Sequence, residues 1–163
     1  MSNYFEKALQ VVIDIEGGYN DDPDDKGGET NFGISKRQYP YINIKDLTED
    51  KARAIYKRDY WNKLHLDKVK NYEVALELFD TGINTGVTKA VFILQEALNY
   101  LGHTLKIDGI IGPITLSAVN KYKYPKDLVK TLDGVQFMHY LNIVKKNPSQ
   151  KKFARGWLKR ISF

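Results

Sequence analysis

Apolar side chains recur every three or four residues along most of this 163-residue chain. The first such stretch, residues 3–15, places Phe5, Leu9 and Val12 along one side of a helix. No segment shows a strong alternation of apolar and polar residues, which would indicate a half-buried strand. The pattern therefore predicts a mainly α fold in which helices pack against helices.

Glycine and proline residues divide this pattern into separate helices with short connections. A chain of this length fits one compact domain. A break in the helical pattern near residues 86–88 separates two regions, 1–87 and 88–163, which we expect to pack together as one unit. We expect helices over residues 3–15, 47–64, 71–86, 88–102, 113–122, 125–147 and 149–161.

Positive charge is concentrated in the last third of the chain. Residues 121–163 contain eleven Lys or Arg and two Asp, whereas residues 1–120 contain fourteen Lys or Arg and eighteen Asp or Glu. This asymmetry suggests a polyanionic partner, such as nucleic acid, anionic lipid or an acidic cell-wall polymer. A solvated basic face on amphipathic helices explains the same charge. The alternating basic and aromatic residues at 121–126 are interpreted as surface lysines, so no nucleic-acid partner is expected.

Composition excludes several classes of site. The chain has no cysteine, which rules out disulfides, thiolate metal sites and cysteine nucleophiles. Its three histidines are far apart, so a zinc amidase or peptidase is not expected, and neither a metal nor a cofactor is implied. The first residues do not resemble a signal peptide, and no run approaches the roughly 20 apolar residues of a membrane span.

A glycine- and aspartate-rich segment, residues 17–34, follows the first helix and is expected to form a loop or a short β-hairpin. Glu16 precedes it and continues the apolar face formed by Phe5, Leu9 and Val12. Apolar surroundings and the negative end of the helix both favour a protonated carboxyl group there, as a general acid requires. The alternative is a solvated glutamate at a frayed helix end.

The aspartates of this segment allow two kinds of chemistry. A calcium loop of the EF-hand type fails on its glycine and glutamate positions, although an irregular calcium site stays open. A pair of carboxyl groups for glycoside hydrolysis is the other possibility. Asp25 and Thr30 follow Glu16 by nine and fourteen residues, so both could face it across a glycine-rich hairpin and hold a water molecule.

The run EGGYNDDPDDKGGETNFGIS, residues 16–35, resembles the signature of the glycoside hydrolase 108 family of N-acetylmuramidases. That family shows E-G-G-Y followed by D-x-G-G-x-T-x-x-G, and similar motifs continue to the end of the chain. Two departures are Lys26, where the family often has proline, and Gln136, where a basic residue that could contact the wall would be expected. The matching motifs are IYKRDYW (55–61), ALELFDTGINTG (75–86), LQEALNYLG (94–102), DGIIGPITLSAV (108–119) and FARGWLKRI (153–161).

The resemblance implies a lysozyme-like fold, with a muramidase region at 1–87 and a peptidoglycan-binding region at 88–163. It implies that Glu16 is the general acid that protonates the β-1,4 linkage between N-acetylmuramic acid and N-acetylglucosamine. Asp25 and Thr30 would position an attacking water, which inverts the anomeric carbon. Asp21, Asp22 and Asp24 lie close to Asp25 and are alternatives for its role.

Five further residues are candidates for contacts with the substrate. Tyr19 and Asn31 belong to the motif, and Trp61 could stack on a sugar ring, although aromatic residues at helical spacing are more often core. Asp80 and Asn84 share one face of an apolar helix, where a polar pair either braces the Glu16 loop or lines the cleft.

The resulting expectation is a monomeric muramidase that acts on peptidoglycan strands. The basic last third would draw it to anionic wall or outer-membrane polymers. Without a signal peptide, it would be made in the cytoplasm and reach the wall by holin-type or other release, as for a phage endolysin; secretion-linked remodelling of the wall is the other role. The rival functions are a lytic transglycosylase that uses Glu16 alone and an inactive wall-binding or nucleic-acid-binding module.

Overall fold

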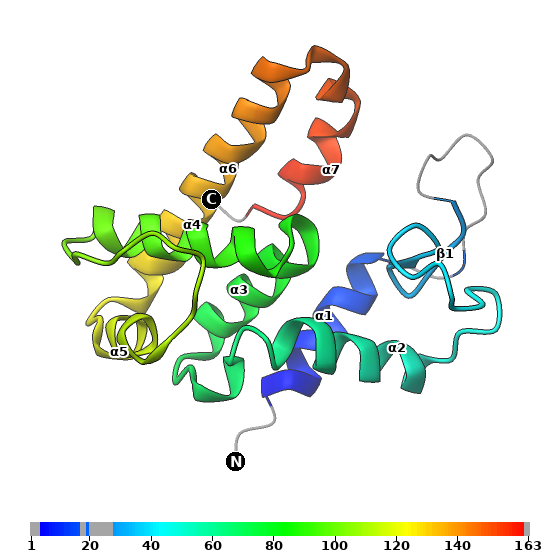
Figure 1. Ribbon diagram of the computed structural model, residues 1–163, viewed down its shortest axis with the longest axis horizontal. Coiled ribbons are helices and arrows are strands. Elements are labelled where there is room, and N and C mark those ends of the chain that lie inside the picture. Colours follow the sequence, from blue (N-terminus) through cyan, green and yellow to red (C-terminus); the bar gives the residue numbers. More distant parts are fainter. Residues whose placement is uncertain (1–3, 17–18, 20–27, 162–163) are drawn as a thin grey trace. The chain divides into compact units, whose positions relative to one another are not determined.

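The computed structural model describes residues 4–16, 19 and 28–161, without the side chains of Ile15 and Glu16. The chain forms two compact units, Met1–Asn62 and Lys63–Phe163. This division falls at a different position from the expected regions 1–87 and 88–163, which stay a prediction about function. The expected mainly α fold is confirmed (Figure 1). Among the helices described, none is long and apolar enough to cross a membrane.

The first unit begins with helix α1, Tyr4–Glu16, whose buried face consists of Phe5, Ala8, Leu9 and Val12. These residues recur at the spacing predicted from the sequence. Glu6, at the start of α1, forms an ion pair with Arg53 of helix α2.

The expected helix over residues 47–64 proved to be two segments. Helix α2, Glu49–Tyr56, starts where the Thr48 side chain accepts a hydrogen bond from the Lys51 amide, as its N-cap position predicts. A π-helical turn, η1, Lys57–Trp61, then continues the chain in place of α-helix. The wider turn accompanies the burial of both Tyr60 and Trp61, which a regular α-helix would direct about 100° apart.

A two-stranded hairpin follows the acidic segment, as expected. Strand β1, Thr30–Asn31, pairs antiparallel with β2, Ile34–Ser35, so that Thr30 lies opposite Ser35. Only two residues connect the strands. This hairpin ends the glycine-rich motif and therefore fixes the position of its threonine.

The second unit is a set of packed helices. Helices α3, Tyr72–Thr85, and α4, Val87–Tyr100, are joined at Gly86, whose φ of 87° is readily adopted only by glycine. Both helices contact α6, Pro125–Lys146, and the shorter α5, Pro113–Lys121, packs against α4. A 3-10 turn, η2, Leu66–Lys68, precedes α3. Figure 1 shows α3 and α4 in green and α6 in orange.

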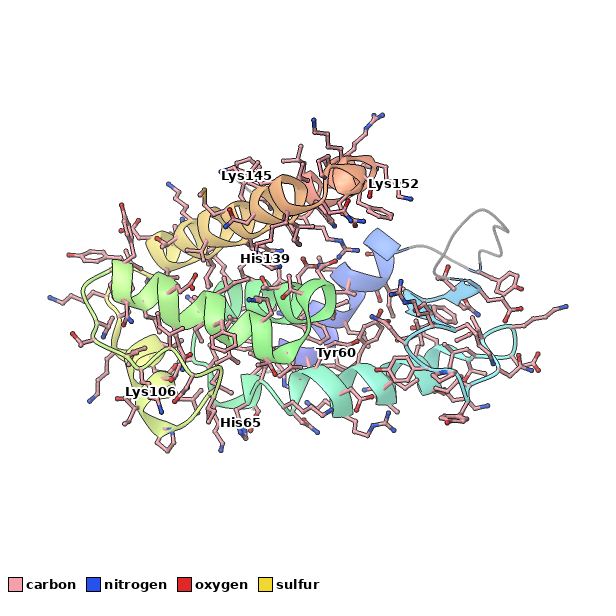
Figure 2. The ribbon with its side chains drawn as sticks, turned by 45° about the horizontal axis from the view of Figure 1, so that its top comes forward. Tyr60, His65, Lys106, His139, Lys145 and Lys152 are labelled. Atoms are coloured by element: carbon pink, nitrogen blue, oxygen red, sulfur yellow. The ribbon has the colours of Figure 1, made fainter. Side chains whose placement is uncertain are left out.

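The C-terminal segment differs from the single helix expected over residues 149–161. It consists of a 3-10 helix, η3, Pro148–Phe153, followed by a short α-helix, α7, Ala154–Leu158. Asn147 caps this segment by accepting a hydrogen bond from the Ser149 amide, and Pro148 sets the first turn. Lys145 and Lys152 are exposed on either side of this junction (Figure 2).

Candidate active site

The carboxyl end of α1 carries the candidate acid. Glu16 is the last residue of this helix, and it follows a face on which Phe5, Leu9 and Val12 are buried. The backbone of Glu16 therefore lies where the helical pattern places it, while its side chain lies outside the described residues. Asp25 also lies outside them, so the two proposed carboxyl groups stay predictions.

The ends of the acidic segment lie close to each other. The Tyr19 hydroxyl donates a hydrogen bond of 3.2 Å to Oε1 of Glu29, ten residues later. This hydrogen bond brings the side chains of Tyr19 and Glu29 together beside the hairpin. The Tyr19 side chain is 45% exposed, so its ring is accessible to a ligand.

The turn between the two strands has an unusual backbone conformation. Phe32 and Gly33 have φ angles of 51° and 73°, as in the two-residue turns that best match the twist of a hairpin. Glycine adopts this conformation readily, whereas a bulky residue such as Phe32 does so at a cost in free energy. The Tyr56 hydroxyl donates a hydrogen bond of 2.9 Å to the Phe32 carbonyl oxygen and so holds the turn against the end of α2.

Asn31 anchors the same hairpin from the inside. Its side-chain amide donates hydrogen bonds to the carbonyl oxygens of Ile44, at 3.2 Å, and Leu47, at 3.3 Å. The side chain is 7% exposed, so the structure assigns it to the support of the hairpin. Thr30, which precedes it, is held in place by pairing with Ser35.

Trp61, a candidate for stacking on sugar, is a core residue of the first unit. It is 1% exposed, and its ring meets Phe5 in an edge-to-face contact with centroids 5.3 Å apart. The ammonium group of Lys57 lies 5.3 Å from the centroid of the same ring. A stacking role would therefore require a rearrangement of this packing.

The polar pair Asp80 and Asn84 on α3 contacts Arg160, which the sequence did not indicate as a site residue. Asn84 donates to Oδ2 of Asp80 at 2.9 Å, and Arg160 forms an ion pair with Oδ1 of Asp80 at 2.7 Å. Both charged side chains of this ion pair are nearly buried. In the second unit, Asp80 thus fastens the C-terminal segment to α3, eighty residues earlier in the chain.

A buried hydrogen-bonded chain links α3 to α6. Thr81 donates to Oε1 of Gln136 at 2.8 Å, and Gln136 donates to the Tyr140 hydroxyl at 2.7 Å. Tyr140 in turn stacks on Trp157, with ring centroids 4.8 Å apart. Gln136 is fully buried, so this position supports the helix packing and cannot contact a wall polymer in this conformation.

Glu77 is a buried carboxyl group beside this chain. Burial, followed by the neighbouring carboxyl groups of Asp133 and Asp80, raises its pKa to about 8, while a hydrogen bond with Thr81 opposes the shift. A glutamate in this environment carries its proton at neutral pH. Because it lies within the helix core of the second unit, we interpret it as a structural acid.

Changing Glu77 to glutamine should reduce the loss of stability that occurs as pH rises. The unfolded chain releases the Glu77 proton near pH 4.5, whereas the folded chain holds it until about pH 8. Folding stability from this group is therefore full below pH 4.5 and falls as pH rises toward 8. We expect the two proteins to differ little at pH 5 and the variant to have an advantage of about 4 kcal/mol at pH 8, measured by urea unfolding. An equal response of both proteins to pH would contradict this assignment.

The part of the chain that the structure describes contains no cluster of three His, Asp or Glu residues arranged to hold a metal ion. A groove of about 830 Å³ lies between α4 and α6, and none of the expected site residues lines it. The residues that line this groove therefore do not include any of the candidate site residues.

Comparison with known protein families gives two matches. Residues 9–86 match the family described as Glycosyl hydrolase 108, and residues 89–162 match the family described as Predicted Peptidoglycan domain. The first match contains Glu16, Asp25 and Thr30. No match was found among curated proteins.

A solved structure resembles almost the whole chain. The structure of Brucella abortus SagA is 32% identical in sequence and superposes with a TM-score of 0.79. The alignment covers 98% of this chain and 90% of the other. The helical arrangement described above is therefore shared by an experimentally determined protein.

Proposed function

The chain belongs to the glycosyl hydrolase 108 family, and on this premise we propose that it is an N-acetylmuramidase with Glu16 as its general acid. The two family matches, a glycosyl hydrolase followed by a peptidoglycan domain, support a peptidoglycan hydrolase. The bond cleaved is the β-1,4 linkage between N-acetylmuramic acid and N-acetylglucosamine. This bond, the residues and the mechanism constitute the proposal.

In the proposed reaction, Glu16 donates its proton to the glycosidic oxygen as that bond breaks. A water molecule attacks the anomeric carbon from the opposite face of the sugar and loses a proton to the second carboxyl group, for which Asp25 is the candidate. The Thr30 hydroxyl orients this water. Direct attack inverts the anomeric configuration and requires the two carboxyl groups to lie roughly 6.5–9.5 Å apart.

The observation that carries the proposal is the hairpin that holds Thr30 at the end of the motif. The Tyr56 hydroxyl holds its turn, and the Asn31 side chain anchors the strand that contains Thr30. A rigid support of this kind is what positioning of a catalytic water requires, because small displacements lower the rate strongly. The strained backbone at Phe32 fits such a site as well.

The basic last third and the peptidoglycan-binding match suggest how the enzyme meets its substrate. Residues 121–163 carry eleven Lys or Arg and two Asp, and peptidoglycan stems and anionic wall polymers offer the opposite charge. We expect this attraction to weaken as salt concentration rises. The proposed enzyme acts as a monomer and reaches the wall through a holin-type system, as a phage endolysin does. Tyr19, Asn84 and Asp80 are its proposed contacts with the glycan.

The products of digestion test the proposed chemistry. Purified peptidoglycan treated with the protein should yield fragments that end in reducing muramic acid, with water incorporated at that end. Mass spectrometry separates these from the 1,6-anhydro ends that a lytic transglycosylase would leave. Early time points followed by proton NMR should show the inverted anomer first. Anhydro ends, or the retained anomer, would overturn the proposed mechanism, and no cleavage at all would favour a wall-binding module.

A further inference from the structure

The groove between α4 and α6 lies entirely within the second unit. It has a volume of about 830 Å³, and the apolar side chains of Ile93, Val135, Met138 and Ile143 are among its lining residues. Met138 is 51% exposed although it belongs to this apolar surface. Exposed apolar surface bounded by charged residues is typical of binding sites.

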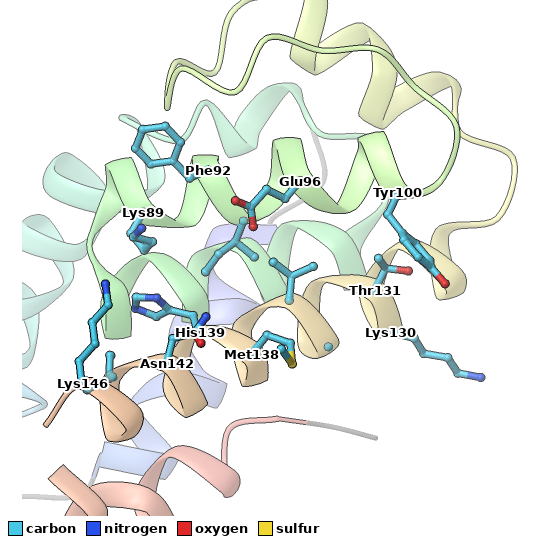
Figure 3. Close-up of a pocket in the computed structure, with 14 residues that line it drawn as sticks. Lys89, Phe92, Glu96, Tyr100, Lys130, Thr131, Met138, His139, Asn142 and Lys146 are labelled. Atoms are coloured by element: carbon cyan, nitrogen blue, oxygen red, sulfur yellow. The ribbon is translucent and has the colours of Figure 1, made fainter. Parts of the chain in front are cut away.

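Positive charge borders both ends of the groove. Lys89 of α4 and Lys146 of α6 approach each other at one end with His139 between them, and Lys130 stands at the other end (Figure 3). Burial, and then the positive charges of Lys89 and Lys146, lower the pKa of His139. Among the described ion pairs, neither lysine has a carboxylate partner. The end of the groove is therefore suited to a carboxylate supplied by a ligand.

Gly134 lies in the wall of the groove, in the interior of α6. A glycine at such a position lowers helix stability by about 1 kcal/mol relative to alanine. Its backbone is helical, and a Cβ atom added there would meet no atom within 4 Å. Neither backbone conformation nor packing within the chain therefore requires glycine. The missing side chain leaves open space in the groove, which allows another backbone to approach closely.

We propose that this groove binds an amphipathic helix with acidic residues at both ends, supplied by a protein partner. The apolar floor receives the apolar face of the helix, with anchors spaced three or four residues apart. Lys89 and Lys146 pair with carboxylates at one end, and Lys130 pairs with a carboxylate at the other. The proposal does not depend on the catalytic assignment of Glu16.

The length of the groove fits this partner. It runs from Lys89 to Tyr100 along α4, which corresponds to roughly 16 Å, or three turns of a helix. Its floor is mostly aliphatic, and methionine adapts readily to apolar side chains of different shape. Glu96 stands at the rim between the two basic ends, so a basic residue near the middle of the ligand would fix its orientation.

The test uses a fluorescein-labelled helical peptide of about 15 residues, or about four turns. Its leucines are spaced four, three and four residues apart, with glutamates at both ends and one lysine at the centre. Fluorescence anisotropy at physiological salt measures binding to the full chain. A peptide of the same composition with scrambled leucines, and one with lysine in place of every glutamate, are the matched controls.

Gly134→Leu should lower the affinity at least about tenfold, because the leucine occupies the groove. Gly134→Ala adds a methyl group where there is open space and should bind like the unchanged protein. Lys146→Glu should weaken binding by a similar factor, while Lys126→Glu, on the same helix outside the groove, should not. Circular dichroism of each variant verifies that the helices are intact.

Three results would overturn the proposal. One is the absence of saturable binding that depends on the leucine spacing. A second is binding that Gly134→Leu and Lys146→Glu leave unchanged, which would mean that the peptide attaches elsewhere. If soluble peptidoglycan fragments bind the groove and the peptide does not, the surface is a wall-binding site and the proposed partner is wrong. Each result can be read whether or not Glu16 is catalytic, because no readout uses enzymatic activity.

Discussion

Replacing Glu16 with glutamine should lower the rate of peptidoglycan hydrolysis by about a thousandfold. Glutamine keeps the size and polarity of the side chain but has no proton to give to the glycosidic oxygen, and general acid catalysis contributes roughly 10²–10⁴-fold to such reactions. The rate is measured as the release of reducing ends from purified wall. Affinity for the wall, measured by co-sedimentation, should stay the same because the peptidoglycan-binding match lies at residues 89–162.

Asp14→Asn is the matched control for this experiment. Asp14 lies on the same helix two residues earlier, is exposed, and accepts a hydrogen bond from Gln10 at 2.8 Å. This variant loses the same type of carboxyl group and should keep nearly full activity. A Glu16→Gln variant that clears wall suspensions at the unchanged rate would show that the catalytic assignment is wrong. Equal losses in both variants would point to an effect on α1 itself.

Replacing Arg160 with methionine should lower the free energy of unfolding by about 3 kcal/mol. The change leaves the Asp80 carboxylate nearly buried without its guanidinium partner, and removing one member of a buried ion pair costs about 3–5 kcal/mol. Unfolding in guanidinium chloride can be followed by the fluorescence of Trp157, which stacks on Tyr140 in the same unit. The transition should move to a lower denaturant concentration.

Two further variants separate the ion pair from the loss of a surface charge. Lys159→Met removes the exposed positive charge next to Arg160 and should cost little. Adding Asp80→Asn to Arg160→Met should restore part of the lost stability, because the neutral amide no longer leaves a charge buried. If Arg160→Met and Lys159→Met have equal effects, the ion pair does not stabilise the fold.

Helix ends that depend on local chemistry were well predicted from the sequence. Thr48 caps α2, Gly86 ends α3 and Pro113 begins α5, as the residue types indicate. The sequence pattern predicted helix over two further segments but did not predict the type of helix. The π-helical turn at Lys57–Trp61 and the 3-10 helix at Pro148–Phe153 both replaced expected α-helix.

Some features of the candidate site were also predicted from the sequence, and others were not. The spacing of Phe5, Leu9 and Val12 placed Glu16 at the end of a buried face, and α1 does end there. The glycine and aspartate content of residues 17–34 predicted a loop or a short hairpin, and a hairpin holds Thr30. Sequence spacing gave no information on the strained conformation of Phe32, because glycine is the residue type that usually signals it.

The amino-acid sequence by itself determined the order and most limits of the helices, the hairpin after the acidic segment, and the family to which the chain belongs. These features depend on residues within one or two helical turns of each other, where propensity and capping act. The tertiary structure alone decided which distant polar groups meet. Arg160 pairs with Asp80, and Thr81 with Gln136 fifty-five residues later, because helix packing excludes water and these polar groups then pair with each other. The open groove beside Gly134 arises in the same way, from the distance between two helices that are far apart in the sequence.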